Sequence, residues 1–104
     1  MEYLNKIELK GLVGHVNIIR VANTRVAHFT LLTQLAYKNS DGEAVVDDTW
    51  HEITAWEDEG ARLEAIVRGA ELRVTGRVRI RKYAGADGVQ RTTHDVLAKT
   101  VEPC

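Results

Sequence analysis

The sequence predicts a single all-β domain over residues 1–104, and three observations support this prediction. Apolar and polar residues alternate with a period of two along most of the chain, which is typical of half-buried strands. Asp-Gly pairs at 41–42 and 87–88 separate alternating segments, as the turns of β-hairpins do. The length of 104 residues is suited to one domain with one modest core.

Five segments have the strand pattern. The first contains Ile7 and Leu9 between charged residues, and the second is the β-branched and aliphatic run 26–37. The third, TWHEITAW, and the fourth, ELRVTGRVRIRK, alternate strictly, and the fifth follows the second Asp-Gly pair. Glycine within a strand often marks a bulge or bend, which barrel closure needs. Three glycines fit this role: Gly11, Gly14 and Gly76.

One segment has a helical pattern instead. Asp58 is a candidate N-cap and Gly69 a candidate C-cap, and Leu63, Ile66 and Val67 form one apolar stripe. We therefore expect a short amphipathic helix at about 58–68. Three strands, a helix and two strands is the order of the OB-fold, a five-stranded Greek-key barrel that binds oligonucleotides or oligosaccharides. Element order alone leaves the ligand open.

Composition narrows the function classes. The net charge of −1 and pI of about 6.4 argue against a protein that wraps duplex DNA, although Lys and Arg cluster between Arg68 and Arg91. No apolar run approaches the roughly 18 residues that span a bilayer, and the N-terminus lacks the apolar stretch of a secretory signal. With Cys104 as the one cysteine, we expect a cytoplasmic protein without membrane association or cofactor.

Aromatic residues suggest the ligand. Phe29 lies in an apolar strand and is expected in the core, and Tyr3 is expected on the surface. The other four stand beside polar or basic residues: Tyr37, Trp50, Trp56 and Tyr83. A nucleic-acid single strand needs aromatic faces for its bases and cations for its phosphates. Since a strand tryptophan is more often core and strand arginines are usually solvated, the residues alone favour ligand binding only slightly over a structural role.

Five stretches resemble the DNA-binding domain of the bacterial single-stranded DNA-binding protein family. They are NKIELKGLVG (5–14), RVAHFTLLT (25–33), DTWHEITAW (48–56), LRVTGRVRIRKY (72–83) and DGVQRTTHDVLA (87–98). The resemblance implies a DNA-binding protein that protects single strands in replication, recombination and repair, without sequence specificity and without enzymatic activity. It implies that bases stack on Tyr37, Trp50, Trp56 and Tyr83. The phosphate contacts we expect are Arg77, Arg79, Arg81, Lys82, Arg91, Lys6 and Lys10.

The same resemblance implies a homo-oligomer. From the residues alone, His51 fits a core position, a base contact or a metal ligand, and no second ligand has suitable spacing for a metal. In the family this histidine lies at a subunit interface, so we expect His51 in the interface of a homotetramer, with a dimer as the alternative.

The sequence departs from the family at two places. The stretch HVNIIRVANTR lacks the usual proline, so contacts of residues 15–24 are not carried over. The chain ends at EPC, so we expect a domain without a C-terminal linker or acidic tail and do not predict tail-mediated protein partners. We expect the protein to be nucleoid-associated.

Two other functions remain open. One is a primosome-like OB accessory protein that binds single-stranded DNA weakly. The other is a nuclease with a metal held by acidic residues, for which solvated loop charge is the simpler interpretation. The acidic residues concerned are Asp41, Asp47, Asp48, Glu57, Asp58 and Glu59.

Overall fold

The computed structural model, which describes residues 4–59 and 62–104, is an all-β barrel. Its strands are β1 (Ile7–Val21), β2 (Thr24–Lys38), β3 (Ala44–Trp56), β4 (Glu71–Ala84) and β5 (Gln90–Pro103). They close in the order β1-β2-β3-β5-β4, with only β3 and β5 parallel. The predicted OB-fold is confirmed.

Closure of the barrel depends on β1 and on two bulges. The first half of β1 pairs with β4 and its second half with β2. In the β1–β2 ladder the register shifts between Val13 and Val16, where β1 has the extra residue. In the β4–β5 ladder it shifts between Thr75 and Gly76, where Lys99 is the extra residue of β5. At Gly76 a Cβ atom would lie 2.1 Å from the carbonyl oxygen of Leu97, so only glycine allows this approach. Of the three glycines expected at a bulge or bend, Gly14 lies in the β1 bulge and Gly76 faces the β5 bulge, whereas Gly11 pairs with Leu72 without a register shift.

The core lies inside the barrel and is filled by inward-facing strand residues. Phe29 and Leu31 from β2, Ile53 from β3 and Leu72 from β4 are almost completely buried. Phe29 is thus a core residue, as predicted. Burying side chains of this size stabilises the fold by roughly 1.5–3 kcal/mol each.

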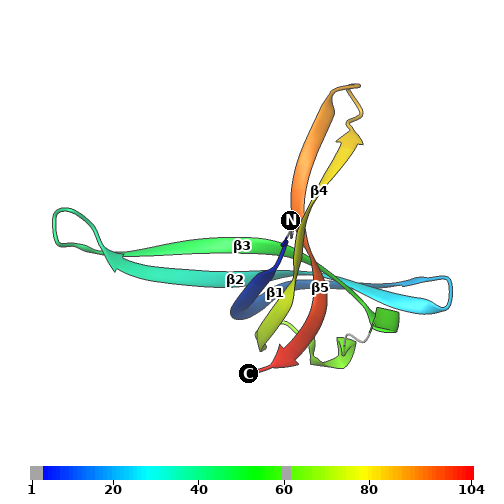
Figure 1. Ribbon diagram of the computed structural model, residues 1–104, viewed down its shortest axis with the longest axis horizontal. Coiled ribbons are helices and arrows are strands. Elements are labelled where there is room, and N and C mark those ends of the chain that lie inside the picture. The colour runs from blue at the N-terminus through cyan, green and yellow to red at the C-terminus, as the bar shows by residue number, and fades with distance from the viewer. Residues whose placement is uncertain (1–3, 60–61) are drawn as a thin grey trace.

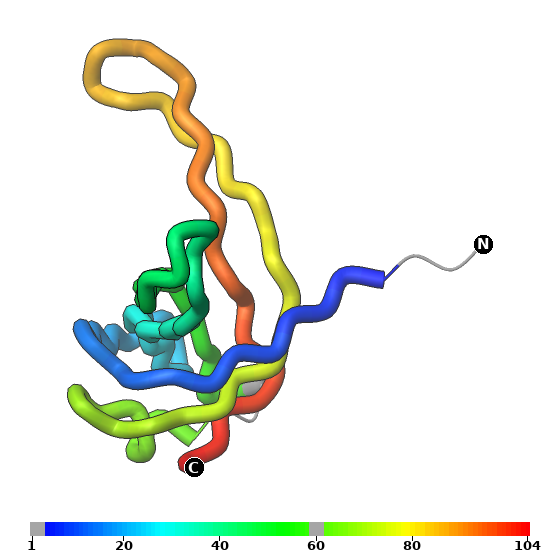
Figure 2. The backbone as a smooth tube through the Cα atoms, turned by 90° about the vertical axis from the view of Figure 1, so that its left-hand side faces the viewer, coloured from blue at the N-terminus to red at the C-terminus, as the bar shows by residue number. Residues whose placement is uncertain are grey.

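Three hairpins extend well beyond this core. Figure 1 shows the β2–β3 hairpin, the β1–β2 hairpin and the β4–β5 hairpin leaving the barrel as separate arms, and Figure 2 shows the β4–β5 arm rising from it. The radius of gyration is 16.0 Å, whereas a compact domain of this length would have about 13 Å. Most residues at the ends of the arms are therefore exposed to solvent.

The turns of two arms lie at the predicted Asp-Gly pairs. In the β2–β3 turn Gly42 donates to the carbonyl of Asn39, and in the β4–β5 turn Gly88 donates to the carbonyl of Gly85. The β1–β2 turn has only two residues between the strands, and its Ala22 has a φ of 55°. We predicted no turn type for this connection.

The segment between β3 and β4 is helical, but it does not form the α-helix expected at about 58–68. It forms two 3-10 turns, Glu57–Glu59 and Leu63–Ala65, and residues 60–61 lie outside the described part of the chain. Leu63 and Ile66 are buried while Val67 is exposed. A spacing of three places side chains directly above one another in a 3-10 helix, and both Leu63 and the C-cap residue Ile66 pack in the core.

Candidate nucleic-acid interface

The outward face of β3 places two tryptophans on the sheet. Trp50, Glu52, Thr54 and Trp56 alternate with inward residues, so they share one face. Trp50 is 57% exposed and Trp56 is half-buried. This is the face that the alternation predicted to be outside the sealed interior.

Trp50 is held against the neighbouring strands rather than extended into solvent. It lies opposite Leu32 of β2. A Cβ atom built on Gly14 of β1 would lie 2.6 Å from Trp50 Cζ3 and 2.8 Å from Thr30 Oγ1. The indole therefore rests over bare backbone at the β1 bulge, with more than half of its surface still free. Such a supported, exposed ring is suited to stacking.

The other two predicted stacking residues lie out on the arms. Tyr37, 44% exposed, pairs with Val45 near the end of the β2–β3 arm. Val45 is five residues from Trp50 along β3, so Val45 and its partner Tyr37 lie on the face opposite to Trp50. Tyr83, 48% exposed, pairs with Arg91 near the end of the β4–β5 arm. The four aromatic residues are thus spread over β3 and two arms and do not form one flat row.

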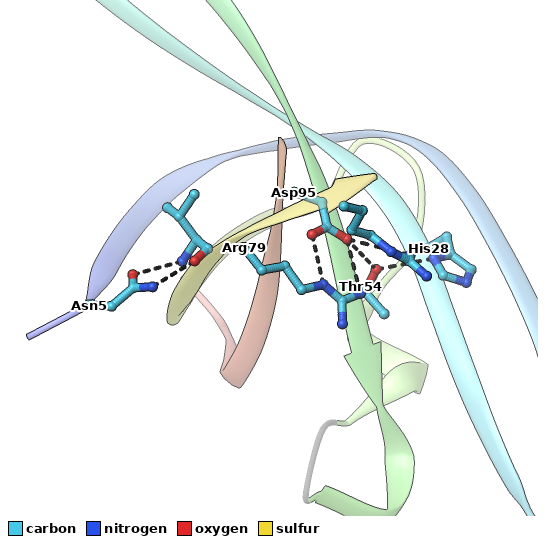
Figure 3. A network of polar contacts seen from close by, with 7 residues as sticks. Asn5, His28, Thr54, Arg79 and Asp95 are labelled. Carbon is cyan, nitrogen blue, oxygen red and sulfur yellow. Dashed lines mark hydrogen bonds and ion pairs between the residues drawn. The ribbon is translucent and has the colours of Figure 1, made fainter. Parts of the chain in front are cut away.

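Arg79 is engaged in a network that connects four strands (Figure 3). Its Nε and Nη2 donate to Asp95 Oδ1 and Oδ2 at 2.7 and 3.0 Å. Thr54 Oγ1 donates to Asp95 Oδ2 at 3.4 Å, and His28 Nδ1 lies 3.2 Å from the same hydroxyl. The network ties β4 and β5 to β3 and β2 over the outer face of the barrel.

Asp95 is the centre of this network, because its side chain is only 10% exposed. Burial by itself would raise the pKa of Asp95, but the hydrogen bonds and charge of Arg79, helped by Arg81 and Thr54, hold that pKa below its usual value. Asp95 reciprocally raises the pKa of Arg79. The pair is therefore charged in the folded protein.

The other predicted phosphate contacts differ in how firmly they are paired. Arg81 is 3.9 Å from Asp95, Arg91 is 2.9 Å from Asp87, and Lys10 is 3.6 Å from Glu71, and the side chains of these three cations are largely exposed. Lys6, Arg77 and Lys82 are exposed and form no ion pair with any residue that the structure describes. The available positive charge lies along β4 and at the start of β1.

An open groove of about 700 Å³ lies at the bulge between β4 and β5 and brings three cations together. Lys6, Arg77 and Lys99 line it, together with Gly76 and Ala98. The side-chain amide of Asn5 exchanges hydrogen bonds of 2.7 and 3.0 Å with the backbone of Val78 (Figure 3), which fixes the segment before Lys6 along β4. Lys99 was not predicted, although it continues the outward alternation of Asp95 and Leu97.

His51 lies on the inward face of β3, at the mouth of the barrel. It is half-buried, opposite the fully buried Leu31, and its Nε2 is 2.9 Å from Thr33 Oγ1. Burial lowers the pKa of His51, which favours the neutral ring. Its role in a subunit interface stays a prediction.

Two kinds of feature are absent from the described residues. Within 4–59 and 62–104, no three His, Cys, Asp or Glu side chains are grouped as metal ligands would be. In the same ranges, neither helical turn has the length and apolar character of a membrane-spanning helix.

Comparison with solved structures identifies close matches to the whole fold. The Plasmodium falciparum SSB in complex with ssDNA superposes with a TM-score of 0.85 over 100% of this chain and 97% of that one, at 21% identity. A deletion mutant of the single-stranded DNA binding protein from Thermus aquaticus superposes with a TM-score of 0.77, over 97% of this chain and 50% of that one, at 20% identity.

Sequence comparison identifies the family. A single-stranded DNA-binding protein of Neisseria meningitidis is 30% identical over 105 residues, which are 95% of this chain and 59% of that protein. Single-stranded DNA-binding protein B of Bacillus subtilis is 32% identical over 81 residues, covering 77% of this chain and 70% of that protein. This chain thus spans about three-fifths of the Neisseria relative. The model of the single-strand binding protein family matches residues 4–104, and the chain belongs to this family.

Proposed function

We propose that this protein binds single-stranded DNA, stacking its bases on Tyr37, Trp50, Trp56 and Tyr83 without sequence specificity. The observation that best supports the proposal is the exposed indole of Trp50, seated over the β1 bulge on the outward face of the barrel. Base–aromatic stacking contributes roughly 1–3 kcal/mol per base and accepts every base. All four aromatic residues are present, which favours strand binding over the accessory-protein alternative.

The DNA phosphates would form ionic contacts with Lys and Arg side chains that are free to move. Breaking an exposed ion pair costs only about 0–1 kcal/mol, so Arg91 and Lys10 can exchange Asp87 and Glu71 for phosphate. Arg79 is different, because releasing it would leave the nearly buried Asp95 without its partner. We therefore assign phosphate contacts first to the exposed, free or loosely held cations: Arg77, Arg81, Lys82, Lys6 and Lys99. Arg79 positions β4 and β5.

The biological role that follows is protection of exposed strands in replication, recombination and repair, in the cytoplasm near the nucleoid and without catalysis. We propose a homotetramer, with a dimer as the alternative, and His51 in the subunit interface. Exposed apolar side chains on the β2–β3 and β4–β5 arms would be available for contact with a partner subunit. They include Leu35, Val46 and Ile80.

Tryptophan fluorescence tests the proposal directly, because Trp50 and Trp56 are the only tryptophans in the sequence. Adding an oligothymidylate of about 15 nucleotides, the upper range for one OB-fold, should quench the emission. Added salt should reverse the quenching, since binding releases counterions from the phosphates. Unchanged emission at low salt would contradict the proposal, and the mass of the free protein in solution would decide between tetramer and dimer.

A further inference from the structure

An unpaired carboxylate lies within the proposed stacking face. Glu52 is exposed, shares its face with Trp50 and Trp56, and lies opposite Thr30. None of the ion pairs among the described residues includes it. A surface that only stacks bases and neutralises phosphates has no use for a free negative charge, because that charge repels the backbone of the strand.

The position of Trp50 gives this carboxylate a defined neighbour. The indole leans over Thr30 and Gly14, and Thr30 Oγ1 accepts a hydrogen bond of 2.9 Å from the backbone of His15. The ring is thereby supported from below and open above. Trp50 and Glu52 are two residues apart on one strand, which places their side chains about 6–7 Å apart along it. A base stacked on the indole would have one edge within reach of Glu52.

The chemistry of a carboxylate selects among base edges. An ionised carboxylate only accepts hydrogen bonds, and its two oxygens can accept two parallel ones. The Watson–Crick edge of guanine presents two adjacent donors, N1–H and the N2 amino group. Thymine presents a single N3–H between two carbonyl oxygens, which repel a carboxylate. Cytosine and adenine each present one amino donor beside a ring-nitrogen acceptor. Unstacked bases are read on this edge in single strands.

We propose that Glu52 gives the strand-binding face a preference for guanine at the nucleotide stacked on Trp50, by accepting hydrogen bonds from N1–H and the N2 amino group. This inference rests on the proposed stacking site, and it adds a local preference to otherwise unspecific binding. A good bidentate pair discriminates by about 1–3 kcal/mol. Since Glu52 is exposed to water, we expect a preference near the lower limit, about fivefold in Kd.

The test compares oligothymidylates of about 15 nucleotides that differ at one central position, which is thymine, guanine or hypoxanthine. Fluorescence titration should give guanine the lowest Kd. Hypoxanthine, which lacks the N2 amino group, should bind between guanine and thymine. Glu52→Gln should abolish the guanine preference and bind the all-thymine strand slightly better, because a repulsive charge is removed. Equal affinity for the guanine and thymine strands would overturn the inference.

Asp48→Asn is the matched control. Asp48 lies on the same face, two residues on the other side of Trp50, but it accepts a 2.9 Å hydrogen bond from Gln34. This variant removes the same charge and should keep the guanine preference; loss of the preference in both variants would contradict the role of Glu52. Failure of the all-thymine strand to quench wild-type fluorescence would overturn the proposed function itself, and is thus distinct from an absent preference.

Discussion

Two regions of the proposed DNA-binding surface differ in how they are held. The outward face of β3 is part of the barrel wall, where Trp50 rests on β1 and Thr54 is buried beneath the Asp95 network. The end of the β4–β5 arm is a two-stranded ribbon in solvent (Figure 2), and its Arg81, Lys82 and Tyr83 are all exposed. On the first region the side chains are already held in place before DNA binds. On the second region binding must order side chains that are mobile in the free protein.

This difference has an energetic consequence. Ordering a flexible side chain at an interface costs about 0.5–1.5 kcal/mol, and a supported ring has already lost that freedom on folding. The barrel face should therefore contribute most of the stacking energy. The arm should contribute mainly charge, which acts at longer range and depends on salt.

The largest effect that we expect is on DNA affinity, from removal of the Trp50 side chain. Trp50→Ala should weaken binding of an oligothymidylate by about 2–3 kcal/mol, the upper range for one stacked base. Tyr83→Ala should cost only about 1 kcal/mol, because its ring is smaller and sits on the arm. Kd values from anisotropy of a labelled strand, which do not depend on tryptophan emission, measure both. Equal losses would show that support by the barrel does not matter.

The next effect concerns stability. Asp95→Asn should lower the free energy of unfolding by about 1–3 kcal/mol, because it weakens the charged pair with Arg79 at a nearly buried site. Asp87→Asn is the matched control on the arm. Asp87 and Arg91 form an exposed pair, so this variant should change stability by less than about 1 kcal/mol. Urea denaturation measures both, and a larger loss for Asp87→Asn would reverse the comparison.

The pH dependence of the same pair has a definite sign. The folded protein holds the pKa of Asp95 below its unfolded value, so Asp95 binds a proton more readily in the unfolded chain. Its contribution to stability is complete above about pH 4 and is lost as the pH falls through the lowered pKa. Asp95→Asn should therefore reduce the loss of stability below pH 4. An unchanged acid profile would contradict the charged pair.

The two regions were not equally predictable from sequence. Alternation, an apolar run and the Asp-Gly turns identified the five strands, the outward position of Trp50 and the core position of Phe29, because each of these signals is local in the sequence. The partner of Arg79 was not predictable. Asp95 lies 16 residues away and meets Arg79 only through the β4–β5 register. The phosphate contacts were therefore chosen by residue type, without knowing which cations were already paired.

The prediction of an α-helix between β3 and β4 was wrong for a related reason. Leu63, Ile66 and Val67 fit an α-helical stripe in the sequence, but the available space between β3 and β4 accepts only Leu63 and Ile66. Short segments follow the surface that they cover, and tertiary packing overrides their own propensity. The support of Trp50 by Gly14 was equally hidden, since the indole reaches it across β2, at the bulge in β1.

The smallest effect that we expect involves His51, which belongs to the barrel but not to its outward face. Burial lowers the pKa of His51 in the folded protein, so the unfolded chain binds the proton more readily. Its contribution to stability is complete above the unfolded value of about 6.5 and decreases as the pH falls below that value. His51→Asn should flatten this part of the stability profile between about pH 6.5 and 5, as urea denaturation at each pH would show.

If His51 also lies in a subunit interface, the wild-type oligomer should dissociate in the same pH range, because a protonated ring is disfavoured where water is excluded. Light scattering measures the mass of the oligomer at each pH. A constant mass across this range would contradict a place for His51 in the subunit interface, and would leave only its effect on the stability of the barrel.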